Sequence, residues 1–336
     1  ITVCLYMLCS YYAIQGNGFG TLVTFTFGLY TYLLSFTSYS PLISDISSDT
    51  NRGFVSGLGI ASNYTGQFVG LLIALPFSNG TISFFGSNPR AETLLPSVIA
   101  FCVLALPMLI WFKEPKIQNQ LSVGDNGIQH NSNSSIISLL IRDTKTIYKL
   151  PGVALFLLSY FLFNDAVLTA SNNFPIFLES VWGVSDTVKT YILLGILVTS
   201  ALGGLISGKI ADKIGHKRTL MWITGGWIVV LPLVGLSTQF PVFVSMTVIM
   251  GFWFGSNWAV SRSVMSYLAP ARYTNLTFAY YGLVERASSF VGPIIWGLTI
   301  YHFEYTGVAK YRYATLAITC FILLGFIVLS KVRSDR

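Results

Sequence analysis

The chain has 336 residues, of which 53% are hydrophobic and 10% are charged. Soluble domains carry about 25% charged residues, so this composition cannot cover a soluble surface. The apolar residues come in long uninterrupted blocks, which indicates a chain that lies in lipid. The net charge of +7 comes from basic residues scattered between these blocks, with no basic stripe or arm that would predict nucleic-acid binding.

The apolar blocks have the length of membrane-spanning helices. A bilayer core of about 30 Å requires roughly 20 apolar residues per helix. Ten segments are expected to be helical spans: 1–14, 19–42, 54–77, 94–112, 151–174, 188–210, 219–237, 240–260, 275–302 and 311–332. The first is too short to cross, and the chain opens on Ile1 instead of Met, so we expect part of the protein to lie upstream. The sequence therefore predicts an all-α polytopic membrane protein.

Cysteine, histidine and catalytic motifs argue against metal and enzyme chemistry. The four cysteines lie in apolar stretches without CxxC or Cys/His spacing, and the three histidines are far apart in the sequence. The motifs HExxH and GxSxG are not present, and no His/Asp cluster is seen. We expect no cofactor, no metal site and no enzymatic activity.

One polar segment divides the chain. Residues 113–150 are rich in Asn, Ser, Gln and Gly toward their start and predict a linker between an N-terminal half, 1–112, and a six-helix C-terminal half, 151–336. With the linker placed inside, fifteen of the 20 Lys and Arg residues fall on the inner side, four on the outer side and one within a helix. Cytoplasmic loops carry such an excess, so linker and C-terminus are predicted to be cytoplasmic.

A short turn between two of the C-terminal spans combines glycines, one acid and a basic cluster. Gly204 and Gly208 are four apart on one helix face and allow a neighbouring helix to approach closely. Asp212 ends that helix, where its oxygens can accept from a helix N-terminus or a basic partner. The turn then runs through Lys213, Gly215, His216, Lys217 and Arg218. Gly215 permits the tight reversal, and the basic residues hold the loop inside.

This stretch resembles the G-x-x-x-D-[RK]-x-G-[RKH]-[RK] signature of the major facilitator superfamily. The signature follows the second helix of each six-helix half, which implies a major facilitator fold in which the chain runs from helix 3 to helix 12 of twelve. The loop, with Gly208, Asp212, Lys213, Gly215, Lys217 and Arg218, would then be a conformational gate. Because two helices would be missing, we expect no transport by this segment alone.

Polar residues inside the spans mark candidate pathways, since ionisable groups cost several kcal/mol in a membrane unless they are paired or face water. Asn164 and Asp165 lie in the middle of the first C-terminal span, and Thr169 lies four residues beyond Asp165 on the same face. Asp165 could bind a substrate ammonium or carry a coupling proton. A buried hydrogen bond between helices remains the alternative.

Two charged residues are adjacent in the expected span 275–302, which would be helix 11 of the twelve. Glu285 and Arg286 could bind a substrate or form a structural ion pair, and Arg286 could take a substrate carboxylate or pair with Asp165. Arg262 is expected to be an anchor near the inner surface. Gly292-Pro293 offers a bend in the helix.

The N-terminal half carries one polar stripe. Asn63, Tyr64 and Gln67, with Gly66, lie on an otherwise apolar helix. Such a stripe is expected to face a cavity instead of lipid, so these residues are candidates for the substrate pathway.

Several of these segments together are similar to the vacuole effluxer-like family of permeases. The matching residues are Leu42-Ile-Ser-Asp45, Arg52-Gly53 to Gly57, Tyr64-Thr-Gly66, Phe161 to Asp165, the Asp212 loop, Ala259 to Ser263, and Tyr281-Gly282 to Pro293. Glu285-Arg286 stands where the family commonly has Gly-Lys, and Ala166 replaces a usual Gly. The resemblance implies a substrate class of neutral amino acids, which the fungal members export from the vacuole.

The expected function is secondary transport of a small solute by rocker-switch alternating access, with a proton as a candidate coupling ion. A membrane sensor or scaffold that retained the fold is the alternative, and ligand flux would distinguish the two. The protein is expected in the cell membrane of a bacterium or archaeon, or in the vacuolar membrane of a fungus.

Overall fold

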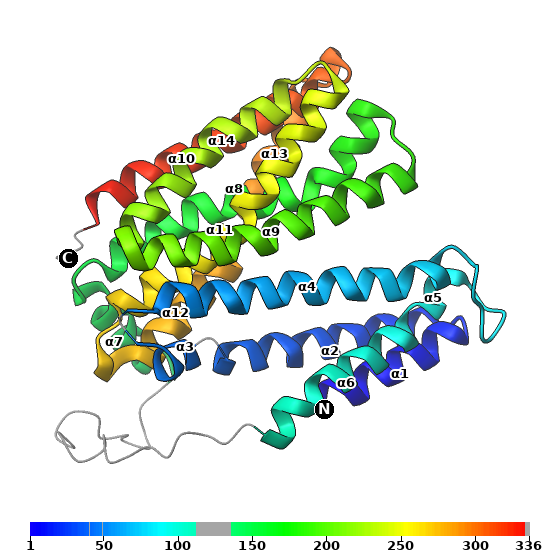
Figure 1. The fold of residues 1–336 in the computed structure, drawn as a ribbon, viewed down its shortest axis with the longest axis horizontal. Helices are drawn as coiled ribbons and strands as arrows, with labels where there is room; N and C mark the ends of the chain where they lie inside the picture. The colour runs from blue at the N-terminus through cyan, green and yellow to red at the C-terminus, as the bar shows by residue number, and fades with distance from the viewer. Residues whose placement is uncertain (40, 49, 112–135, 333–336) are drawn as a thin grey trace. The chain divides into compact units, whose positions relative to one another are not determined.

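The computed structural model describes residues 1–39, 41–48, 50–111 and 136–332, and these residues form helices joined by turns and loops (Figure 1). The longer helices are α1 (Thr2–Ile14), α2 (Gly18–Tyr39), α4 (Arg52–Ser78), α6 (Leu94–Trp111), α8 (Val153–Trp182), α9 (Asp186–Ile214), α10 (His216–Leu236), α11 (Phe240–Leu268), α12 (Thr274–Ala287), α13 (Val291–His302) and α14 (Ala309–Lys331). A further helix of 14 residues is α7 (Ile136–Lys149), and the short elements are α3 (Leu42–Ile46), α5 (Pro89–Glu92), η2 (Ala271–Tyr273) and η3 (Glu304–Thr306).

Membrane-spanning length is reached by seven stretches of the described chain. They are Arg52–Ser78, Pro89–Met108, Val153–Trp182, Thr187–Ile214, His216–Leu236, Phe240–Leu268 and Ala309–Lys331. An integral membrane protein made of helices is therefore confirmed. The count of ten spans and their numbering from 3 to 12 stay predictions, because α1 is short and the span expected at 275–302 is divided into α12 and α13.

Two compact units are present, and they divide the chain differently from the expected halves. One unit comprises residues 1–40 and 67–144, and the other comprises residues 41–66 and 145–336. The first part of α4 thus belongs to the same unit as the C-terminal helices. Within the expected linker, residues 136–149 form α7, and residues 112–135 lie outside the described part. The division at 112 and 150 stays a prediction.

Glycines set the ends of two helices in the larger unit. α8 starts after Gly152 and ends at Gly183, which have φ of +76° and +60°. α9 is capped by the Ser185 hydroxyl, which accepts from the Val188 N–H, and ends at Gly215 with φ +101°. Glycine enters this region of φ at no steric cost.

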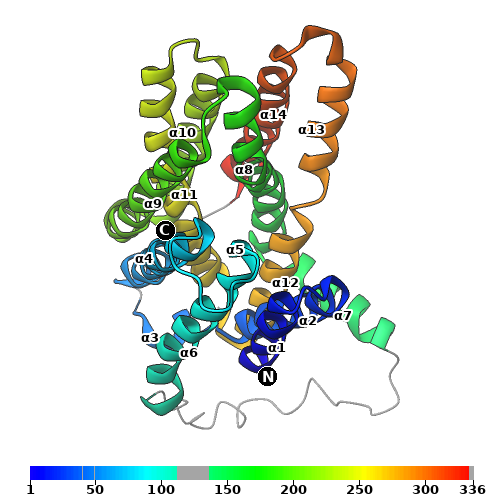
Figure 2. The ribbon, with the colours of Figure 1, turned by 90° about the vertical axis from the view of Figure 1, so that its right-hand side faces the viewer.

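The helices of the larger unit form two groups (Figure 2). α9, α10 and α11 pack on one another, as do α8, α13 and α14, and contacts of α10 with α14 and of α8 with α11 join the groups. The buried core between them includes Phe156, Tyr160, Phe163, Trp227 and Phe243. Apolar side chains such as Trp222 and Leu298 remain exposed on the outer faces, where lipid would cover them.

In the smaller unit, α1 packs against α2 and α6 (Figure 1). The loop before α6 is organised around Glu92, which is 2% exposed. Its carboxylate accepts from the Ser83 hydroxyl at 2.8 Å and from the backbone N–H groups of Phe84 and Ser87 at 2.6 and 2.9 Å. These bonds satisfy a buried charge and give the loop a defined shape.

Candidate functional site

A chain of hydrogen bonds joins three helices at the centre of the larger unit. The Trp258 Nε1–H of α11 donates to Asn164 Oδ1 of α8 at 3.1 Å, and Asn164 Nδ2 donates to Ser288 Oγ at 2.7 Å. Ser288 directly follows α12, and its hydroxyl donates to the Glu285 carbonyl at 2.8 Å. Asn164 is fully buried and has both ends of its amide satisfied. It therefore positions α8, α11 and α12 relative to one another.

Trp258 and Ser288 were not candidates from the sequence. The polar run Ser256-Asn257-Trp258 inside an apolar helix was the signal that could have drawn attention to Trp258. Its partner is 94 residues away along the chain, and no spacing rule connects the two.

The Trp258→Phe variant should lose about 1 to 3 kcal/mol of unfolding free energy, because it leaves Asn164 Oδ1 buried without its donor. Trp222→Phe is the matched control, since Trp222 is 74% exposed. Denaturant unfolding in detergent, followed by residual Trp fluorescence, measures both. Equal stability of the two variants would contradict the structural role of this bond.

Asp165 and Thr169 lie on α8 next to this chain of bonds, and both are fully buried. The two carboxylate oxygens of Asp165 make no hydrogen bond within the described residues. The Thr169 hydroxyl makes none there either. Gly292, in the first turn of α13, packs directly on them. A Cβ placed on Gly292 would overlap the Thr169 hydroxyl and lie 3.1 Å from the Asp165 carbonyl oxygen. The sequence candidates Asn164, Asp165 and Thr169 are thus brought together with the start of α13.

The helix that carries Glu285 is broken, not merely bent. α12 ends at Ala287 and α13 begins at Val291, so the break precedes the Gly292-Pro293 pair that was expected to bend it. Pro293 has no N–H, and its ring would collide with the carbonyl four residues earlier in a continuous helix. The interruption therefore falls one turn before proline, at residues 288–290.

Three charged side chains occupy the adjacent region. Glu285 is half-buried and lies within electrostatic range of Arg262 and Arg286, and its charge also acts on Tyr160 and Tyr281. Arg262 is only 7% exposed, so the expectation of a surface anchor was wrong. It reaches inward because acidic and aromatic partners lie in the protein. Arg286 is exposed, and no ion pair with Asp165 is present among the described residues.

The Asp212 loop meets the start of α4. Asp212 Oδ1 accepts from the Gly53 N–H at 2.6 Å and Oδ2 accepts from the Phe54 N–H at 2.8 Å. These N–H groups lack partners within their own helix, and a carboxylate is favoured there by the helix dipole. Lys209 also lies over the Phe54 ring, 5.0 Å from its centroid. Asp212 therefore caps a helix that begins 160 residues earlier in the chain.

Glycines line the same contact between α4 and α9. A Cβ on Gly57 would overlap the Gly204 carbonyl, and one on Gly208 would overlap the Gly53 carbonyl. The close approach expected at Gly204 and Gly208 is thus present. Its partners Gly53 and Gly57 show the same four-residue spacing, which was a readable signal in the sequence.

The remaining residues of the loop have different positions. Gly215 makes the reversal with positive φ, and the Lys217 ammonium donates to the carbonyls of Ser330 and Val332 at the end of α14. Lys213 and Arg218 are exposed. Lys217 thus ties α10 to the last helix, as a cation near a helix C-terminus does.

The polar stripe on α4 is divided between two environments. Tyr64 is buried, and its ring lies 6.4 Å from that of Trp258, close to the Asn164 bonds. Asn63 and Gln67 are exposed. Tyr64 is therefore linked to the polar centre of the larger unit, and Asn63 and Gln67 remain candidates for contact with a solute.

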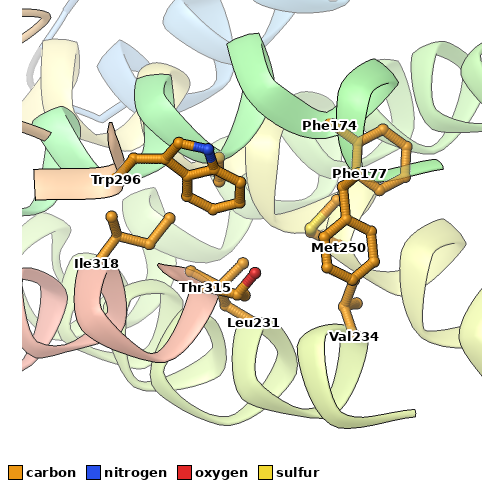
Figure 3. A pocket seen from close by; sticks show the side chains of 9 residues that line it. Phe174, Phe177, Leu231, Val234, Met250, Trp296, Thr315 and Ile318 are labelled. Atoms are coloured by element: carbon orange, nitrogen blue, oxygen red, sulfur yellow. The ribbon is translucent and has the colours of Figure 1, made fainter. Parts of the chain in front are cut away.

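Two hollows in the larger unit are unsuitable for a polar solute. The first, shown in Figure 3, has a volume of about 20 Å³, enough for about one water molecule. It is lined by Ala170, Phe174, Phe177, Leu231, Val234, Met250, Trp296, Thr315 and Ile318. The second, of about 610 Å³, lies along α10 and α11 and is almost entirely apolar. Neither offers charged ligands.

Comparison with known proteins shows the family. Residues 43–336 match the family described as vacuole effluxer Atg22 like. An uncharacterized MFS-type transporter, YxiO, of Bacillus subtilis is 24% identical over 88% of this chain and 67% of its own length. Autophagy-related protein 22 of Candida glabrata is 24% identical over 85% of this chain, which spans 57% of the fungal protein.

A solved structure shows the same fold. The Escherichia coli fucose:proton symporter FucP superposes with a TM-score of 0.72 over 99% of this chain and 83% of its own, at 11% identity. The arrangement of helices is therefore that of the major facilitator fold. Because the family match covers most of the sequence, the chain belongs to the vacuole effluxer Atg22-like family of major facilitator secondary transporters.

Proposed function

We propose that the protein carries a small zwitterionic solute, a neutral amino acid, across the membrane. The supporting observation is the group formed by Glu285, Arg262 and Arg286, which lies beside Tyr160 and Tyr281 within the helices of the larger unit. Charged side chains within a membrane are costly and mark functional sites. A carboxylate and guanidinium groups side by side suit the ammonium and carboxylate of an amino acid.

Access to this group would alternate by a rocker-switch movement of the two halves. The contact of Asp212 with α4 supports one closed state, because it is a polar bond at a helix end that can break and re-form as a unit. Gly208, Lys213, Gly215, Lys217 and Arg218 would complete the gate loop, and Asn63 and Gln67 would line the pathway. Binding sites of such carriers lie between their repeats near the bilayer midplane.

The proposed orientation has the linker and C-terminus in the cytoplasm, on the basis of the distribution of basic residues. The membrane would be the cell membrane in a bacterial or archaeal source and the vacuolar membrane in a fungus.

Counterflow of a labelled amino-acid panel into proteoliposomes that contain the full-length protein tests the function. Glu285→Gln and Arg286→Gln should each lower amino-acid counterflow at least tenfold, about 1.4 kcal/mol or more of lost transition-state stabilisation. Arg90→Gln is the control, because Arg90 is exposed on α5, the short helix before α6.

Three results would contradict the proposal. Counterflow of sugars or other metabolites without amino acids would exclude the substrate class. Wild-type rates in both variants would remove Glu285 and Arg286 from the site. Binding of amino acids without flux would instead indicate a sensor that retained the fold.

A further inference from the structure

Asp165 differs from the other acids described in the larger unit by its complete enclosure without a side-chain partner. Its side chain is fully buried, and its two oxygens make no hydrogen bond within the described residues. Thr169, on the same face one turn away, is in the same condition. An ionised carboxylate in such a place is far more costly than a neutral one. A solute cannot touch Asp165 in this conformation, so direct substrate binding does not explain it.

Within the described part of the chain, no cation is among the groups that act on the Asp165 charge. α11 and α12 bring Arg262, Arg286 and Glu285, which act on one another and on Tyr160 and Tyr281. α14 packs on α8 through small and apolar residues such as Gly325, and its described charged residues are Lys310, Arg312 and Lys331 toward its ends. α13 carries His302 at its far end. Among the described residues, the group that acts on the Asp165 charge is the backbone N–H of Gly292.

Gly292 lies at the point where α13 can move. It packs on Thr169 without a side chain, directly after the break between α12 and α13. Trp296, one turn further along α13, borders the small apolar cavity that begins at Ala170, next to Thr169 (Figure 3). Packing around α13 therefore leaves a small cavity on the side that faces α8, next to the break that separates this short helix from α12.

A proton fits this site better than a metal cation. The described ligands would be one carboxylate and one hydroxyl, whereas hard cations such as Ca²⁺ and Mg²⁺ take about six or more oxygens. The positive end of α13 faces the carboxylate, which disfavours a bound metal cation there. While the site is closed, the cost of an ionised carboxylate away from water is the larger effect and favours the protonated acid. Water that enters when α13 withdraws would remove the cost of burying the charge and would favour loss of the proton.

We propose that Asp165 is the proton carrier of this transporter, protonated while Gly292 of α13 packs on α8 and deprotonated when α13 moves away. An O–H bond forms at the carboxylate by transfer from hydronium on one side of the membrane, and it breaks by transfer to water on the other side. This rests on the proposed transport function. Asn164 has a positioning role, since its bonds to Trp258 and Ser288 hold α8 against the break.

The test uses proteoliposomes with the full-length protein and the amino acid that gives the fastest counterflow. With equal pH on both sides of the membrane, the counterflow rate of Asp165→Asn should stay within about twofold of the wild-type rate. Its accumulation of substrate driven by a pH gradient should be at least tenfold lower than that of wild type. Asp143→Asn is the matched control, because the Asp143 carboxylate is partly exposed and lies 3.6 Å from the neighbouring Arg142 guanidinium. A pH-sensitive dye should report substrate-dependent proton movement in wild type and not in Asp165→Asn.

A substrate-independent measurement separates this proposal from the proposed function. Infrared difference spectra of wild type minus Asp165→Asn, recorded on purified protein near pH 7, should contain the C=O stretch of a protonated carboxyl group. If no amino acid is transported, the proposed substrate class fails, and this band still decides whether Asp165 holds a proton.

Several outcomes would overturn the proposal. They are the lack of that band, pH-driven accumulation by Asp165→Asn at the wild-type level, and accumulation driven by Na⁺ but not by pH. If a correctly folded Asp165→Asn protein loses both counterflow and pH-driven accumulation, Asp165 is a structural or substrate-binding residue instead.

Discussion

Replacement of Gly255 by leucine is expected to disrupt the packing of α9 against α11 and to prevent stable folding. A Cβ on Gly255 would overlap the Ser200 carbonyl and lie 3.0 Å from the Gly204 nitrogen, so the backbones themselves are in contact. Overpacking of a core typically costs about 1 to 3 kcal/mol, and here no flexible side chain can give way. We expect a loss above 3 kcal/mol, seen as aggregation or a large fall in melting temperature of the detergent-solubilised protein.

Gly225→Leu on α10 is the control for this change. The position of a Cβ on Gly225 has no neighbouring heavy atom within 4 Å, so leucine there should leave the melting temperature nearly unchanged. Hydrogen bonds reinforce the Gly255 contact, since the Ser200 hydroxyl donates to the Gly251 carbonyl at 2.8 Å and Ser207 pairs with Ser256 at 2.6 Å. A Gly255→Leu protein as stable as Gly225→Leu would contradict this arrangement.

The Asp212→Asn variant should release the start of α4. The change removes the negative charge and one of the two acceptors for the N–H groups of Gly53 and Phe54. Hydrogen bonds to a charged group contribute about 1.5 to 3 kcal/mol each. Hydrogen–deuterium exchange of peptides that cover residues 50–60 should therefore be at least tenfold faster than in wild type.

If the contact between Asp212 and α4 stabilises one state of the carrier, the counterflow rate of Asp212→Asn should change together with its hydrogen–deuterium exchange. Glu304→Gln is the control, because Glu304 is an exposed acid far along the chain. Unchanged exchange in Asp212→Asn would show that the α4 start is held by other contacts. Faster exchange with unchanged counterflow would separate the cap from the gate and leave Asp212 a structural role.

Much of the architecture was accessible from the sequence because the bilayer imposes it. A span must be long, apolar and helical, since lipid offers no partners for backbone groups. The expected spans therefore coincide closely with α9, α10 and α14, and they match the starts of α8 and α11, which continue eight residues beyond the expected ends. The family resemblance followed from short local signatures such as the Asp212 loop, whose spacing does not depend on distant contacts.

The local sequence was less informative about side chains whose position depends on contacts with other helices. Arg262 was expected at the inner surface and is buried beside Glu285, because an anchor and a buried cation have the same sequence pattern. A bend was expected at Gly292-Pro293, and the helix is instead interrupted at residues 288–290, because proline excludes helical geometry in the turn before it. The Asp212 acceptors were expected at a helix N-terminus or a basic partner, and the structure identifies α4.

The sequence by itself determined that this is a membrane protein of packed helices with few ionisable groups inside, because the bilayer acts on each span separately. Only the tertiary structure decided which polar groups meet. Asn164 is bound to Trp258 and Ser288, while its neighbour Asp165 lies against Gly292 without a side-chain partner among the described residues. Adjacent residues on a helix point about 100° apart, so packing of the neighbouring helices gives one of them structural hydrogen bonds and leaves the other a buried carboxyl group without a side-chain donor.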